Sequence, residues 1–213
     1  MKRLGLVLMT LLLVFSASAC FKDSGKSEKS TIEIKKNDVY AMPDNSTDIM
    51  TKYYNKITKE LNGNNDDEKL AKLVAQSFSA EFFTLKNKDG ASDVGGVTYI
   101  VPSDQETFLD YASNYVYANY EAISDDYGSA SLPEVSKVSV EDIALVSYTY
   151  PLLIPADEAS GTAAYTSDTL FDAYKVDVNI TYKDTKVSED DLKKNATIYI
   201  IKVDGRICVA EIA

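Results

Sequence analysis

The chain of 213 residues carries 22 Lys and Arg against 33 Asp and Glu, a net charge of -11. A chain this acidic is repelled by nucleic-acid phosphates and by anionic lipid headgroups, so we expect no nucleic-acid partner. The sequence contains no histidine, which excludes Ser-His-Asp and Cys-His catalysis and most zinc or copper sites. We therefore expect a non-catalytic protein without metal or cofactor.

The first twenty residues have the layout of a secretory signal. Lys2 and Arg3 precede an apolar run over 4–15, and small residues at 16–19 lead to Cys20. An apolar run of about 12 residues spans about 18 Å of helix, well short of a hydrocarbon core of about 30 Å. The pattern predicts a signal peptide over 1–19 rather than a lasting transmembrane helix.

The Ser-Ala-Ser-Ala-Cys stretch at 16–20 resembles the lipobox of bacterial lipoproteins, in which small residues precede a cysteine that becomes diacylated. Ala17 stands where such motifs usually carry leucine. The resemblance implies lipid on Cys20 and an extracytoplasmic, membrane-anchored location; cleavage that leaves a soluble secreted protein is the alternative.

The segment after Cys20 is polar and rich in Ser and Lys, which is typical of a flexible tether, and we place this tether at 20–43. Because the mature chain is acidic, its attachment to the membrane is expected to come from the lipid and not from a basic patch.

A single domain is expected over 44–213, and its first half is helical. One amphipathic helix follows capping residues at 44–47 and stops at Asn62-Gly63, and a second is capped by Asp66. A third follows the capping box at 103–106 and ends before Gly128. The apolar residues that this third helix carries are Phe108, Leu109, Ala112, Tyr115, Val116, Tyr120 and Ile123.

The second half of the domain reads as strands. Residues 135–150 hold two alternating stretches separated by Glu141-Asp142, and 171–182 alternate cleanly between apolar and polar side chains. Two further strands, at 196–203 and 206–212, flank Asp204-Gly205, a strong hairpin signal. Helices followed by a meandering antiparallel sheet predict an α+β fold.

This order of elements, together with the final hairpin, resembles the nuclear transport factor 2-like fold, also called the cystatin-like α+β roll, over 44–213. The segment 78–96, with Phe-Phe-Thr-Leu running into Val-Gly-Gly, is also similar to uncharacterised lipoproteins of Gram-positive bacteria. The resemblance implies a curled four-stranded sheet whose concave face either holds a small apolar ligand or is filled by side chains. The residues expected on that face are Tyr174, Val176, Val178, Ile180 and Ile200.

The same superfamily includes ketosteroid isomerase, in which an aspartate base works with Tyr and Asp donors and needs no histidine. An apolar pocket raises carboxyl pKa values, so that an acid can stay protonated and donate. No base can be assigned here, since Asp177 falls on the polar phase of its strand.

Tyrosines are the candidate binding residues, because they give a large contact area with a polar tip. We single out Tyr117, Tyr148, Tyr150 and Tyr174 as ligand-binding candidates. Tyr111 and Tyr115 are expected to pack on the sheet, whereas Tyr117 is off that stripe and is expected on the surface.

Three acidic clusters lack the spacing of a calcium loop, and we interpret them as solvated surface and helix starts. The segment 151–170 is too long for an ordinary hairpin loop, so it forms either a lid or a partner-binding segment. The hypothesis for the whole chain is a lipid-anchored binding or interaction module. The alternatives are a ketosteroid-isomerase-like enzyme and a component of an envelope or conjugation-type assembly, with an envelope protein as partner.

Overall fold

The structure, a computed structural model, describes residues 30–157, 159–183 and 185–213. The signal expected at 1–19 and the expected lipidation site Cys20 lie outside these residues. None of the helices in the described part of the chain is both long and apolar enough to cross a membrane.

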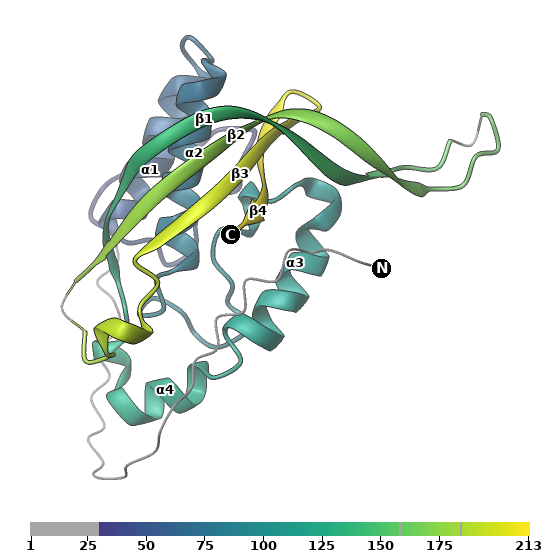
Figure 1. Cartoon of the computed structure of the whole chain (residues 1–213). Coiled ribbons are helices and arrows are strands. Elements are labelled where there is room, and N and C mark those ends of the chain that lie inside the picture. Colours follow the sequence, from purple (N-terminus) through teal and green to yellow (C-terminus); the bar gives the residue numbers. More distant parts are fainter. Residues whose placement is uncertain (1–29, 158, 184) are drawn as a thin grey trace.

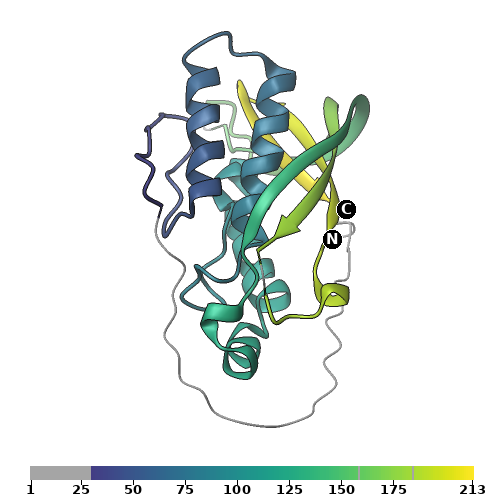
Figure 2. The same ribbon diagram turned by 90° about the vertical axis from the view of Figure 1, so that its left-hand side faces the viewer.

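Two long helices pack side by side on one face of the sheet (Figures 1 and 2). Helix α1 (Asp48–Leu61) begins after Thr47. Helix α2 (Asp67–Phe82) is capped by Asp66, whose carboxylate accepts a hydrogen bond from the backbone N–H of Lys69. Both helices were predicted, and both bury the apolar stripe that the sequence shows, including Tyr54, Ile57, Val74 and Phe78.

The sheet is an antiparallel meander in the order β1-β2-β3-β4, so the predicted α+β class is confirmed. Its strands are β1 (Val135–Ile154), β2 (Tyr165–Tyr182), β3 (Asn195–Val203) and β4 (Arg206–Ile212). The β3–β4 turn has positive φ at Asp204 (50°) and Gly205 (79°), as the Asp-Gly signal predicts.

The sheet is not strongly curled, in contrast to the roll that was expected (Figure 1). Strand β3 pairs with β2 only between Tyr174 and Asn179. The outer half of the β1–β2 hairpin therefore continues past β3 and β4 as a two-stranded arm. Most of the segment 151–170 belongs to this arm, since 151–154 pair with 165–168.

Strand β1 is continuous, whereas the sequence suggested two stretches. Val140 pairs with Val178 and Asp142 with Asp177, so Glu141 is the extra residue of a β-bulge. A bulge changes which alternate residues face the core. Val138 and Val140 pack inward before it and Ile143 after it, which is why the alternation appeared to be broken.

The third helical region is shorter and less regular than predicted. Helix α3 (Gln105–Tyr111) continues into a π-helical turn (Ala112–Val116), and α4 (Tyr120–Tyr127) follows. A π-turn holds more residues than an α-turn and so rotates the following side chains around the axis. Tyr115 is 71 % exposed and Tyr117 only 3 %, the reverse of the expectation.

Residues 30–43, placed in the tether by their composition, lie against the domain. Asn55 of α1 accepts from the N–H of Lys35 (2.7 Å) and donates to the carbonyl of Glu33 (2.8 Å). Tyr40 is buried and donates to the carbonyl of Ile207 in β4 (2.6 Å). The boundary set at residue 44 therefore lies within packed structure. The polar composition was misleading because α1 side chains pair with the backbone of this segment.

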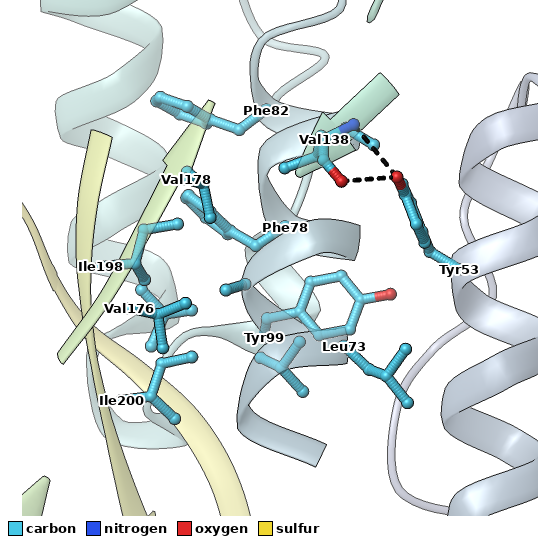
Figure 3. Close-up of a cluster of buried hydrophobic side chains, with 14 of the residues drawn as sticks. Tyr53, Leu73, Phe78, Phe82, Tyr99, Val138, Val176, Val178, Ile198 and Ile200 are labelled. Atoms are coloured by element: carbon cyan, nitrogen blue, oxygen red, sulfur yellow. Dashed lines mark hydrogen bonds between the residues drawn. The ribbon is translucent and has the colours of Figure 1, made fainter. Parts of the chain in front are cut away.

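Tyr53 fastens α1 to the edge strand β1. Its hydroxyl accepts from the N–H of Val138 (3.0 Å) and donates to the carbonyl of the same residue (2.9 Å), as Figure 3 shows. We expect Tyr53→Phe to lower the free energy of unfolding by about 2 kcal/mol, because a buried N–H loses its partner. Urea denaturation followed by circular dichroism measures this. Tyr165→Phe, on the exposed arm, is the control, and an equal loss in both variants would contradict the role of the bond.

Candidate functional site

The space between the helices and the inner sheet face is filled by side chains. Val176, Ile198 and Ile200 are fully buried among Phe78 and Tyr99 (Figure 3). Of the two states left open for the concave face, the structure therefore shows packed core. Tyr174 is half-buried at the edge of this core, and its own burial and the carboxylates at the start of α2 raise its pKa.

A polar network is enclosed in this core. Tyr99 donates to Glu81 Oε1 (3.0 Å), and the Ser77 and Tyr99 hydroxyls are 2.8 Å apart. Burial raises the pKa of Glu81 from 4.5 to about 7, against the opposing effects of Lys88, of Tyr99 and of the Gly96 N–H. Burial also lowers the pKa of Lys88, although carboxylates around it favour its charge.

A carboxyl with a raised pKa beside a tyrosine donor is the kind of pair that the isomerase alternative requires. Ser77 and Tyr99 are both 0 % exposed, however, so the network is sealed by the helices and the sheet. Its evident role is to fasten α2 to the loop 86–96 and to the short helix η1 (Val97–Tyr99).

Two of the predicted tyrosines meet on the outer sheet face, the one turned away from α1 and α2. Tyr148 stacks on Tyr199 of β3 with 4.9 Å between ring centroids, and its hydroxyl donates to Glu211 Oε2 of β4 (2.5 Å). Tyr150 donates to Asp104 at the start of α3. Burial and these carboxylates raise the pKa of both tyrosines, so both remain neutral donors.

A hollow of about 290 Å³ lies on the same outer face, and its lining residue Thr197 is two positions before Tyr199 on β3. Asp177 is central to it, and accepts from Thr197 Oγ1 (2.5 Å) and from Lys175 Nζ (3.0 Å). These bonds lower the pKa of Asp177, which keeps this carboxylate ionised. The polar residues that line the hollow are Glu141, Asp177, Asn179, Asn195 and Thr197. We refer to this hollow together with Tyr148, Tyr150, Tyr199 and Glu211 as the outer-face site.

Tyr117 does not belong to this site. Its ring packs on Phe82 and its hydroxyl donates to the Phe82 carbonyl (2.5 Å), so the expectation of a surface tyrosine is wrong. In this region the exposed Tyr115 stacks on the half-buried Tyr111, with 5.1 Å between the ring centroids.

Sequence reasoning missed Tyr199, Glu211 and Glu81. Tyr199 lies between the buried Ile198 and Ile200 on β3, an alternation that the sequence shows but that does not by itself place the residue beside Tyr148. Glu81 lies three residues after Phe78 on the apolar stripe of α2. A carboxylate at a stripe position was the available signal of a buried acid.

The two remaining kinds of chemistry concern cysteine and metal. Cys208 is buried, and burial raises the pKa of its thiol to about 11, which makes it a poor nucleophile. Among the residues that the structure describes, no three acidic or cysteine side chains converge as metal ligands.

A scan of protein-family models, a search of curated proteins and a search of solved structures found no match to this chain.

Proposed function

We propose that this chain is an extracytoplasmic lipoprotein, acylated on Cys20, whose domain binds a partner through the outer-face site. The observation that carries the binding role is the stacked Tyr148–Tyr199 pair on the sheet face that also holds a hollow with an ionised Asp177. Tyrosine is enriched at protein–protein interfaces relative to the rest of the protein surface. The helix order and the antiparallel meander support a nuclear transport factor 2-like relationship, which we propose for the fold.

The charge of the site favours a basic polypeptide as the partner. Glu141, Asp177 and Glu211 carry carboxylates on this face, and Lys175 is already paired with Asp177. Between the bulge at Glu141 and Pro151, strand β1 also has a short regular edge, which can accept an extended peptide through its backbone. An envelope protein with a basic extended segment would satisfy both features.

Titration with a deca-arginine peptide, followed by amide chemical shifts in NMR, tests the site. We expect shifts concentrated at Asp177, Thr197 and Tyr199 that are weakened by Tyr199→Ala and unchanged by Tyr165→Ala. Deca-glutamate is the charge-reversed control. Shifts confined to the acidic start of α2, or none at all, would overturn the assignment.

The anchor is tested separately, by intact mass spectrometry of the protein purified from bacterial membranes. The expected mass corresponds to a chain that begins at a diacylated Cys20, and Cys20→Ser is expected to move the protein to the soluble fraction. A mature form with an unmodified Cys20 would rule out the lipid anchor but would not bear on the proposal that the outer-face site binds a partner.

One observation favours the envelope-assembly alternative. On the arm and at its base, Leu145 (62 % exposed), Leu153 (43 %) and Leu170 (69 %) are at register positions that share one face. Exposed apolar residues gathered on one face suit contact with another protein. Light scattering after size exclusion, compared with a Leu145→Ser/Leu170→Ser variant, distinguishes the two functions: a concentration-dependent oligomer lost in the variant supports assembly, and a monomer in both opposes it.

A further inference from the structure

The negative charge of the chain is not evenly distributed. Residues 64–213 contain 12 Lys and Arg against 26 Asp and Glu, whereas 30–63 contain five of each sign. The stretch that contains helix α1 and the segment beside it is therefore neutral in net charge, whereas 64–213 as a whole have a net charge of -14.

Unpaired lysines gather on this side. A surface groove of about 810 Å³ between residues 32–35 and α1 is lined by Lys35, Lys56 and Lys59, with Glu33 as its one acidic lining residue. No salt bridge between described residues involves these three amines, although Lys56 also lies 5.5 Å from the Tyr53 ring centroid. Between described residues, the lysines that form salt bridges all lie within 64–213: Lys69, Lys72, Lys86, Lys175, Lys183, Lys194 and Lys202.

The groove is firmly built. Asn55 brackets the backbone of 33–35 with two hydrogen bonds, and Thr58 donates to the Lys35 carbonyl (2.8 Å). Ile32, at the rim, is 41 % exposed. Such a groove fits the boundary between lipid headgroups and acyl chains, where an apolar side chain can enter the membrane while lysine amines on long stems reach the headgroups.

The short stretch of chain between Cys20 and the groove points to the membrane as the partner of the groove. Ser30 is held at the start of α1 by its N–H bond to the Ser46 carbonyl (2.8 Å) and its hydroxyl bond to Asp48 (2.9 Å). The ten residues from 20 to 29 reach at most about 36 Å even when fully extended. Lipid on Cys20 would therefore keep the groove within reach of the membrane surface.

We propose that the α1 groove is the membrane-facing surface of the domain and binds the phosphates of anionic lipid headgroups through Lys35, Lys56 and Lys59. This inference rests on the proposed lipid anchor. The lipid holds the protein at the membrane, and the groove sets its orientation, because the acidic remainder is repelled by the same surface. Since α1 and α2 cover one sheet face, this orientation turns the outer-face site away from the membrane (Figure 2).

The test couples Cys20 of the mature chain chemically to a maleimide lipid, so that it does not depend on acylation in the cell. Vesicles of phosphatidylcholine alone are compared with vesicles that also contain phosphatidylglycerol. Lysine amines are acetylated with a water-soluble reagent, and the rate at each site is measured by mass spectrometry. An anionic surface favours the ammonium form of each nearby lysine over the reactive neutral amine by about fivefold. We therefore expect several-fold slower acetylation at Lys35, Lys56 and Lys59 on anionic vesicles.

Lys175 and Lys186, away from the groove, are the internal controls and should react equally on both vesicles. High salt should remove the slower acetylation of the groove lysines on anionic vesicles. The double variant Lys56→Glu/Lys59→Glu should remove it at Lys35. The control variant Lys186→Glu should leave it intact. Equal acetylation of the groove lysines on both vesicles would overturn the orientation. An unmodified Cys20 in the intact mass would instead overturn only the natural anchor.

Discussion

Replacing Gly95 by alanine is expected to lower the free energy of unfolding by about 3 kcal/mol or more. An added Cβ would lie 2.1 Å from the carbonyl oxygen of Glu81 and 2.7 Å from Lys88 Nζ. The first neighbour is helix backbone and cannot move without distorting α2, and overpacking of this kind costs about 1–3 kcal/mol and sometimes more. The same displacement would pull the loop away from the buried Glu81 network.

Gly90→Ala is the matched control for Gly95→Ala, because it is in the same loop and its nearest atom is Glu121 Oε1 at 3.4 Å. We expect its stability to change by less than about 0.5 kcal/mol. Urea denaturation of both variants, with the Cys20→Ser chain as the common background, gives the comparison. A small effect at Gly95 would mean that the loop does not pack on α2 as described.

The pH dependence of stability is expected to change when Glu81 is replaced by glutamine. In the folded state the pKa of Glu81 is about 7, against 4.5 ordinarily, so folding favours the protonated carboxyl. The stabilisation from the protonated form is complete below pH 4.5 and is lost as pH rises through 7. A shift of this size corresponds to about 3 kcal/mol, and Glu81→Gln should remove that loss.

The measurement is the difference in unfolding free energy between Glu81→Gln and the parent chain at pH 4.5 and pH 8. We expect the variant to gain about 3 kcal/mol relative to the parent between these values, because glutamine resembles the protonated acid at every pH. Glu106→Gln, which removes an exposed carboxylate from α3, is the control for the change of side chain. A difference for Glu81→Gln that does not change with pH would mean that water reaches the Glu81 carboxylate.

The elements that sequence reasoning placed correctly have local signals. The caps of α1 and α2, their apolar stripes and the Asp204-Gly205 turn each depend on residues within a few positions of one another. The alternation of 171–182 likewise survives in β2, because one face of that strand is buried along its inner half.

The features that were missed depend on contacts distant in sequence or on one inserted residue. The bulge at Glu141 and the π-turn over 112–116 each insert one residue, which changes the side chains that face the core from that point on. A single inserted residue looks the same in the sequence as an ordinary irregularity of the apolar pattern. The docking of 30–43 depends on Asn55 and on Ile207, the latter more than 160 residues away from Tyr40. Of the outer-face site, Tyr148 and Tyr150 were singled out from the sequence as binding candidates, whereas their structural partners Tyr199 and Asp104 come from other elements.

The bulge in β1 also makes it harder for another copy of the chain to add a strand to this edge of the sheet. An unpaired edge strand is a template on which another copy can add a strand, and β1 is an edge strand of 20 residues. Glu141 interrupts its backbone ladder with a charge, Asp142 adds a second, and Pro151 removes a donor further along. Molecules confined to a two-dimensional layer meet far more often than in free solution, so the irregular edge would protect such molecules against fibrous aggregation.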